Sequence, residues 1–278
     1  SPFTDAPVPE TVGPWRPTVR LGAGGMGVVY AAERTDASFH QRAALKLVRP
    51  GFGADFRDRF LRERRLLASL DHTGIARLLD GGLTADGLPY LAMELVDGDS
   101  ITSYVREHEL AIRDRLELFL QACEAVAHAH RHLVVHRDLK PAHMLVETNE
   151  QGAPRVKLLD FGIAKLLDAD DEAILTRTGG GPMTPQYAAP EQVTGGAITT
   201  ATDVYALGVV LYELLTGHRP YNLAGLSPSE AEHVVTSSTP TRPSAMPDTV
   251  TDPRRLRGDL DTVVMKALAK EPERRYAS

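Results

Sequence analysis

A glycine-rich run near the N-terminus has the composition and spacing of a phosphate-binding turn. A protein backbone without Cβ atoms can approach an anion closely and donate N–H hydrogen bonds to it. A dinucleotide-binding fold would need a helix directly after the glycines, but residues 27–31 are β-branched and strand-like. The pattern therefore predicts a turn between two strands that lies over a phosphate chain, formed by Gly22, Ala23, Gly24, Gly25, Met26 and Gly27.

A lysine within the apolar run 43–48 is a candidate cation for the same phosphates. Lys46 is either the ammonium that pairs with phosphate oxygens or a solvated lysine on a strand edge. In the first case it needs a carboxylate partner on the next helix. Glu63 is the natural choice and Asp58 is the rival. Spacing alone does not separate the two acids.

Four further motifs follow in a fixed order along the chain. Residues 136–141 read HRDLKP, 160–162 read DFG, 189–191 read APE and 203–208 read DVYALG. Each motif alone is a weak signal, but their order after a glycine turn and a strand lysine is highly specific. In this order they resemble bacterial eukaryotic-like (Hanks-type) protein Ser/Thr kinases, and the resemblance covers almost the whole chain.

The resemblance implies an α+β, two-lobe protein-kinase-like fold. After a tail over 1–13, residues 14–95 would form a small antiparallel β-sheet N-lobe, and residues 96–278 a mainly helical C-lobe that lacks its last helix. The implied activity is ATP-dependent transfer of the γ-phosphate to Ser/Thr hydroxyls of protein substrates. Self-association for autophosphorylation would accompany it.

Phosphoryl transfer needs positioning and charge neutralisation more than covalent work by the protein. The resemblance makes Asp138 the group that accepts or orients the substrate hydroxyl's proton. Lys140 would be a point charge near the transferred phosphate. Asp160 would bind Mg²⁺ as a hard oxygen ligand, while Lys46 and Glu63 would form the pair that holds the α- and β-phosphates.

The adenine site is also implied by the resemblance. Met93 resembles the gatekeeper before a hinge that runs from Glu94 to Val96. An apolar sandwich around the base would come from three residues for which a plain core role fits the sequence equally well, Val29, Ala44 and Leu145.

Regulation by phosphorylation is expected between the DFG and APE motifs. Thr176 and Thr178 lie where related bacterial kinases carry phosphothreonines, and Arg137 would pair with the added charge. Thr184, like Lys140, resembles the pattern of Ser/Thr kinases rather than that of tyrosine kinases.

The resemblance also implies two structural anchors. Asp203 would hold the backbone of His136, and Glu191 would form an ion pair with Arg275.

His143 departs from the pattern of the family that the chain resembles. That family places a metal-binding Asn five residues after the catalytic Asp, and this chain has a histidine there. An imidazole offers nitrogen, whereas Mg²⁺ demands oxygen ligands. Three interpretations stay open: an impaired kinase that prefers Mn²⁺, a nucleotide-binding pseudokinase, or a residue introduced to trap an inactive state.

The elements that must position these residues follow from hydrophobic periodicity. A strand-rich first third gives way to a helix-rich remainder, and two Pro/Ser/Thr-rich stretches, 226–229 and 236–253, are expected to be surface loops. The expected strands span 16–21, 27–33, 43–48, 76–79 and 90–95, and the expected helices 56–70, 113–131, 202–215 and 260–269.

Composition excludes several other classes of protein. The formal net charge is −6, which gives no support to a nucleic-acid or anionic-membrane binder. No run reaches the 18 or so apolar residues of a membrane helix. The single cysteine, Cys123, allows no internal disulfide or Cys-based zinc site and is expected to pack in a helix. We expect a cytoplasmic protein and, because there is no initiator Met, a fragment of a longer chain.

Overall fold

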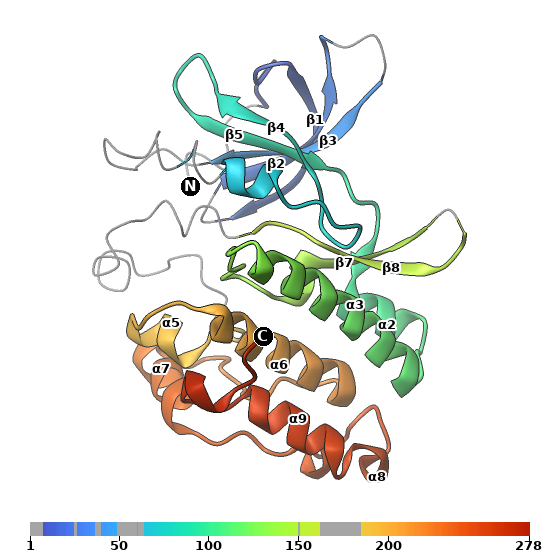
Figure 1. Ribbon diagram of the computed structural model, residues 1–278, viewed down its shortest axis with the longest axis vertical. Coiled ribbons are helices and arrows are strands. Elements are labelled where there is room, and N and C mark those ends of the chain that lie inside the picture. Colours follow the sequence, from blue (N-terminus) through green and yellow to red (C-terminus); the bar gives the residue numbers. More distant parts are fainter. Residues whose placement is uncertain are drawn as a thin grey trace. The chain divides into compact units, whose positions relative to one another are not determined.

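A computed structural model describes residues 8–24, 27–36, 40–48, 60, 64–149, 151–161 and 185–278. These residues fall into two compact units, one ending at Asp97 and the other beginning at Gly98. Figure 1 labels most of the helices and strands of both units. Within the described ranges, no helix is both long enough and apolar enough to cross a membrane.

The first unit is built on a five-stranded antiparallel sheet with the strand order β1-β2-β3-β5-β4. Four of the five expected strands coincide with observed ones, but the strand expected at 76–79 is misplaced. It begins at Leu78 and continues through two glycines to Leu83, because it pairs with β5 across the turn at Asp86 and Gly87. The strands are β1 (Trp15–Gly24), β2 (Gly27–Arg34), β3 (Arg42–Val48), β4 (Leu78–Leu83) and β5 (Pro89–Glu94).

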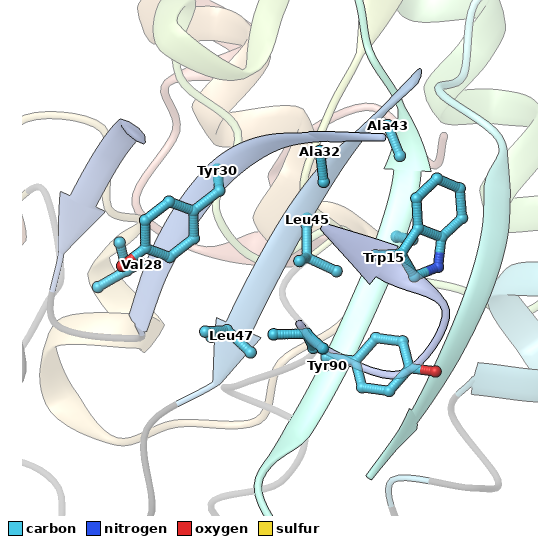
Figure 2. Packing of buried hydrophobic residues seen from close by; sticks show 10 residues of the cluster. Trp15, Val28, Tyr30, Ala32, Ala43, Leu45, Leu47 and Tyr90 are labelled. Atoms are coloured by element: carbon cyan, nitrogen blue, oxygen red, sulfur yellow. The ribbon is translucent and has the colours of Figure 1, made fainter. Parts of the chain in front are cut away.

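One face of this sheet carries the core of the unit, and Figure 2 shows its side chains gathered there. Trp15 is fully buried, yet its indole N–H donates to Asp80 Oδ2 at 3.0 Å, and the Tyr90 hydroxyl donates to the same oxygen at 3.2 Å. Each large apolar side chain buried here contributes about 1.5–3 kcal/mol. Because a one-residue slip would turn these side chains out of the core, the core also fixes the register of the strands.

The second unit is mainly helical and contains one small sheet. The sheet has the order β6-β7-β8, with bounds Asp99–Ser100, Met144–Thr148 and Pro154–Leu158. Short 3₁₀ turns lie at Pro141–His143, Pro243–Ala245 and Pro272–Arg274. The helices are α2 (Ile101–Glu107), α3 (Ile112–Arg131), α5 (Pro190–Thr194), α6 (Thr200–Thr216), α7 (Pro228–Ser237), α8 (Pro253–Leu256) and α9 (Asp259–Ala267).

Helix α6 is the centre of this unit. It is buried on nearly all sides, as a helix that is apolar all round must be. Thr199 and Thr202 close its first turn as a capping box, and Gly217 ends it in the left-handed conformation. Both α3 and α9 pack against it. The expected helices at 113–131, 202–215 and 260–269 are thus confirmed as α3, α6 and α9, with shifted ends.

The stretch 226–229 was expected to be a surface loop, and it is exposed, but only residues 226–227 are loop because α7 begins at Pro228. Ser227 caps α7 and Glu230 completes the capping box, so the Pro/Ser-rich composition here marks a helix start. The second expected loop, 236–253, also overlaps the end of this helix. Cys123 lies on α3, as expected, and is half-buried there; burial raises its pKa to about 12.

Candidate active site

The sheet of the first unit brings four candidate residues to one face. Antiparallel partners point to the same side, and Val29 pairs with Lys46 while Ala44 pairs with Met93. Positions 44 and 46 of β3 also share a face, so all four side chains lie opposite the core of Figure 2. Each is half-buried. The face therefore combines apolar side chains with one cation, as a nucleotide would require.

The glycine run joins β1 to β2, with Gly24 paired to Gly27. A strand rather than a helix follows it, which confirms the arrangement expected from the sequence. Gly27 has φ +145°, and a Cβ there would lie 1.9 Å from the carbonyl oxygen of Leu47, so no other residue fits. Gly22 has open space around it, and Ala23 and Gly24 are exposed like it. Gly25 and Met26 lie outside the described residues.

Lys46 lies on β3, the middle strand of the five. The alternative of a solvated lysine on a sheet edge is therefore wrong. Its expected partner Glu63 and the rival Asp58 both lie outside the described residues. Glu94 and Val96, the expected hinge, lie within three residues of the division between the two units after Asp97.

In the second unit, Asp203 of α6 holds the start of the catalytic loop. Its carboxylate accepts from the backbone N–H groups of His136 and Arg137 at 2.7 and 2.9 Å. His130 of α3 lies 2.8 Å from the same carboxylate through Nε2. The expected contact between Asp203 and the backbone of His136 is confirmed. Asp203 is 1% exposed, so the loop is anchored to α6 by a buried carboxylate.

The fully buried His136 links the loop to the end of β8. Its Nε2–H donates to the carbonyl oxygen of Leu159 at 2.9 Å, and its ring packs on Phe161 with centroids 4.6 Å apart. Burial lowers the pKa of His136, although the nearby carboxylate of Asp203 opposes this shift. A neutral imidazole therefore joins the HRD and DFG segments.

Arg137 has φ +66°, in a region that costs a non-glycine residue roughly 1–2 kcal/mol. Side chains from two helices hold this peptide in place. Asp203 accepts from its N–H, and the Gln192 side chain on α5 donates to its carbonyl oxygen at 2.8 Å. Sequence reasoning missed Gln192, because a single polar residue after the APE motif gives no signal of a contact 55 positions away.

Asp138 and Lys140 come together on this loop. Lys140 Nζ donates to Asp138 Oδ2 at 2.9 Å. The side chain of Asp138 is 9% exposed and that of Lys140 is 19% exposed. A carboxylate held in this way is oriented and still reachable. It is the kind of group that accepts a proton from a hydroxyl.

His143 lies between the two acidic motifs. Its Nδ1 is 2.8 Å from the carbonyl oxygen of Asp138, and its Nε2 is 3.9 Å from Asp160 Oδ2. Burial lowers the pKa of His143 to about 4, with the Asp160 carboxylate opposing the shift. The backbone is fixed as well, because the carbonyl oxygen of His143 accepts from Leu159 N–H at 2.9 Å.

A divalent cation can be tested against these side chains. Among the described residues, no three acidic, His or Cys side chains meet as a metal site. Where a phosphoryl group is transferred, phosphate oxygens supply some of the metal's ligands, so a small donor set is expected. Asp160, with its side chain 20% exposed, offers oxygens that fit Mg²⁺. His143 offers nitrogen and does not fit Mg²⁺.

Glu191 and Arg275 form the ion pair that the sequence predicts. Two guanidinium nitrogens of Arg275 lie 2.7 and 2.8 Å from the two oxygens of Glu191, and Thr202 donates to Glu191 as well. Burial alone would raise the pKa of Glu191, but the hydrogen bonds from Arg275 and Thr202 lower it overall. The pair clips the helix after the APE motif to the body of the unit.

Some of the site residues predicted from the sequence cannot be assigned to a site from the described residues. Thr176, Thr178 and Thr184 lie outside the described residues. Leu145 lies on β7 of the second unit, paired with Lys157. Its place beside an adenine base with Val29 and Ala44 stays a prediction.

Comparison with known proteins identifies the class. The chain matches the protein kinase domain over residues 15–278 and belongs to that family. It is 39% identical to serine/threonine-protein kinase PknB of Mycolicibacterium smegmatis over 92% of this chain and 40% of that protein. It is 38% identical to serine/threonine-protein kinase Pkn1 of Myxococcus xanthus over 96% of this chain and 37% of that protein.

The solved PknI kinase domain of Mycobacterium tuberculosis is similar in fold. It superposes with a TM-score of 0.70 at 28% identity, covering 98% of this chain and 94% of that chain. The α+β, two-lobe kinase fold and the likeness to Hanks-type bacterial kinases are thereby confirmed. The chain spans about 40% of the length of the curated relatives it matches.

Proposed function

We propose that this chain is the catalytic domain of an ATP-dependent protein Ser/Thr kinase, with residues 14–95 as its N-lobe and 96–278 as its C-lobe. The observation that carries the proposal is the catalytic loop. Asp138 bears a carboxylate oriented by Lys140 at 2.9 Å, on a backbone that Asp203 holds through two N–H groups. Named relatives that are serine/threonine-protein kinases support it.

In the proposed reaction, Asp138 receives the proton of a Ser or Thr hydroxyl as that oxygen attacks the γ-phosphate of ATP. The new O–P bond forms while the bond to the β-phosphate oxygen breaks, and ADP leaves. Lys140 holds the Asp138 carboxylate in place and neutralises charge beside it. A bound divalent metal ion would neutralise charge on the phosphate oxygens.

The first unit is proposed to hold the nucleotide. Backbone N–H groups of residues 22–27 would cradle the phosphates, and Lys46, steadied by Glu63, would pair with them. Adenine would lie on the half-buried face that carries Val29, Ala44 and Met93. The backbone from Glu94 to Val96 would serve as the hinge, and Leu145 would complete the apolar surroundings of the base.

We propose a divalent metal ion held by Asp160, either Mg²⁺ or Mn²⁺, as the cofactor. Control by phosphorylation is proposed at Thr176, Thr178 and Thr184, with Arg137 as the partner of the added charge. Two copies would associate so that one phosphorylates the other. Mass spectrometry of active protein should find phosphate on Thr176 or Thr178, and finding neither would refute this part.

The substrates of the full protein are proposed to be other proteins, in the cytoplasm where ATP is available.

A second candidate function is nucleotide binding without transfer, as in a pseudokinase that acts as an interaction or signalling scaffold. The observation that favours it is His143, a nitrogen donor where the family places the amide oxygen of Asn.

One assay separates the two candidates. Radiolabelled ATP is incubated with the protein and a general protein substrate, with Mg²⁺ and Mn²⁺ in parallel, while binding of a fluorescent ATP analogue is measured separately. Transfer to Ser or Thr with either ion supports the kinase. Binding without transfer supports the scaffold, and the absence of both overturns the proposal.

A further inference from the structure

We infer that His143 is a nitrogen ligand for a divalent metal ion shared with Asp160, and that this ligand makes the position select Mn²⁺ over Mg²⁺. The inference rests on the proposed function, because the remaining ligands would be phosphate oxygens of ATP. It assigns a specific atom, Nε2, and a specific class of ion, a transition metal that accepts imidazole.

The hydrogen-bond partner of Nδ1 fixes which nitrogen carries the lone pair. Nδ1 lies 2.8 Å from the backbone carbonyl oxygen of Asp138. A carbonyl oxygen only accepts, so Nδ1 bears the hydrogen and, in the neutral ring, Nε2 bears the lone pair. Histidines that bind metals in proteins almost always donate their other N–H to a backbone carbonyl, a carboxylate or water. His143 is held in this way.

The free nitrogen is on the side of Asp160. Nε2 and Asp160 Oδ2 are 3.9 Å apart, too far for a hydrogen bond. At metal–ligand distances of about 2.1 Å, two donors on one octahedral ion are about 3.0 Å apart when adjacent and about 4.2 Å when opposite. The observed separation lies within that span. A cation bound by both atoms would fit this separation.

Both donors are placed by the same backbone contact, so the gap between them is built into the fold. The His143 carbonyl oxygen accepts from Leu159 N–H at 2.9 Å, directly before Asp160. The N–H of His143 in turn donates to the Lys140 carbonyl oxygen at 2.9 Å. The side chains are 15% and 20% exposed at His143 and Asp160, so they are confined but reachable by an ion.

The chemistry of the pair sets the preference. Mg²⁺ demands oxygen ligands in a near-ideal octahedron and gives up water reluctantly, whereas first-row transition metals accept imidazole nitrogen. Replacing nitrogen by the amide oxygen of Asn should therefore favour Mg²⁺. We expect His143→Asn to lower the ratio of Mn²⁺ to Mg²⁺ affinity at least tenfold.

The test measures metal ligation directly. Mn²⁺ is bound to wild type in the presence of the non-hydrolysable β,γ-methylene analogue of ATP, and pulsed electron paramagnetic resonance detects coupling to imidazole nitrogen. The expected result is a histidine signal in wild type that is lost in His143→Asn. Titration of the Mn²⁺ signal with Mg²⁺ gives the affinity ratio.

His132 supplies a matched control, because its Nδ1 also contacts a backbone carbonyl oxygen, that of His128, at 2.9 Å, but at an exposed site. His132→Asn should keep the nitrogen signal. Absence of nitrogen coupling in wild type, or an equal affinity ratio in wild type and His143→Asn, would overturn the inference. The measurement of metal ligation does not require phosphate transfer. A nitrogen signal in a protein without kinase activity would therefore refute only the proposed kinase function. Kinase activity without the nitrogen signal would refute only the assignment of His143 as a metal ligand.

Discussion

At the scale of single residues, two side chains share the oxygens of Asp138. Lys140 donates to the carboxylate at 2.9 Å, while His143 Nδ1 contacts the backbone carbonyl at 2.8 Å and lies 3.5 Å from the carboxylate. The imidazole thus keeps the loop ordered even though it removes an amide oxygen. The side chain at position 143 can therefore hold the loop in place without also supplying an oxygen ligand to a metal ion.

Restoring the amide at this position should raise activity with Mg²⁺. His143→Asn is expected to increase the rate of phosphate transfer severalfold or more, because an oxygen ligand replaces nitrogen. The measurement is the initial rate with saturating ATP and Mg²⁺. An unchanged rate would show that His143 does not limit turnover.

A second residue-scale prediction concerns Tyr212 in α6. Its side chain is fully buried, and the described structure gives its hydroxyl no hydrogen-bond partner. Because an unsatisfied buried polar group costs about 1–3 kcal/mol, Tyr212→Phe should leave the free energy of unfolding unchanged or raise it. Urea denaturation measures this.

Tyr187→Phe is the matched control for that change. The Tyr187 hydroxyl donates to Glu213 Oε2 at 2.6 Å, so its loss should destabilise the fold. A larger loss of stability in Tyr212→Phe than in Tyr187→Phe would show that the Tyr212 hydroxyl has a partner.

At the scale of elements, helix α5 is tied to the catalytic loop by one side chain. Gln192 accepts from the N–H of Ala189 at 3.1 Å and donates to the carbonyl oxygen of Arg137 at 2.8 Å. Ala189 of the APE motif and Arg137, the residue before Asp138, are therefore joined through the Gln192 side chain.

Gln192→Glu keeps the acceptor and removes the donor, so the hydrogen bond from Gln192 to the Arg137 carbonyl is lost. A lost hydrogen bond of about 1.4 kcal/mol that orients Asp138 would lower kcat about tenfold. Steady-state kinetics should show this fall in kcat, with little change in KM for ATP or in the melting temperature.

Gln121→Glu is a matched control, since Gln121 on α3 also joins a helix to backbone, accepting from Val156 N–H at 2.9 Å. It should leave kcat near wild type. Equal effects of the two changes would mean that Gln192 only stabilises the unit.

Elements with their own periodicity could be predicted from the sequence, and those that depend on distant partners could not. α3 and α6 follow from a helical apolar pattern. The start of α7 was hidden because Pro228 and its serines resemble a loop, although Ser227 and Glu230 carry the capping box. The β7–β8 hairpin was missed because its short strands lie between two chemical motifs.

The candidate site shows the same division. Asp138 and Asp160 could be predicted because their motifs are local. The tether from Gln192 and the orientation of the His143 ring could not, because each depends on a carbonyl oxygen whose position only the folded chain defines.

At the scale of the whole molecule, stability of the second unit depends on a buried charge pair. Arg275, with a side chain that is 0% exposed, joins Glu191 through two hydrogen bonds and also donates to backbone carbonyls of Ala201 and Lys270. A partner removed from such a pair leaves an uncompensated charge, which costs about 3–5 kcal/mol.

Glu191→Gln should therefore lower the free energy of unfolding by that amount at neutral pH. The pKa of Glu191 is lowered in the folded protein, so its ionised form stabilises the fold above its ordinary pKa of 4.5. This contribution is lost as the pH falls through the folded pKa. Denaturation curves of wild type and Glu191→Gln should converge in acid, and a difference that does not shrink would contradict the assignment.

The central claim is that Asp138 carries phosphate transfer. The most direct test is the initial rate of transfer from radiolabelled ATP by wild type, Asp138→Asn and the control Asp86→Asn, an exposed turn residue. We expect Asp138→Asn to lose at least about a hundredfold in kcat, the usual contribution of a positioned acid–base group, while nucleotide binding and the Asp86→Asn rate stay near wild type. Transfer by Asp138→Asn at the wild-type rate would contradict it.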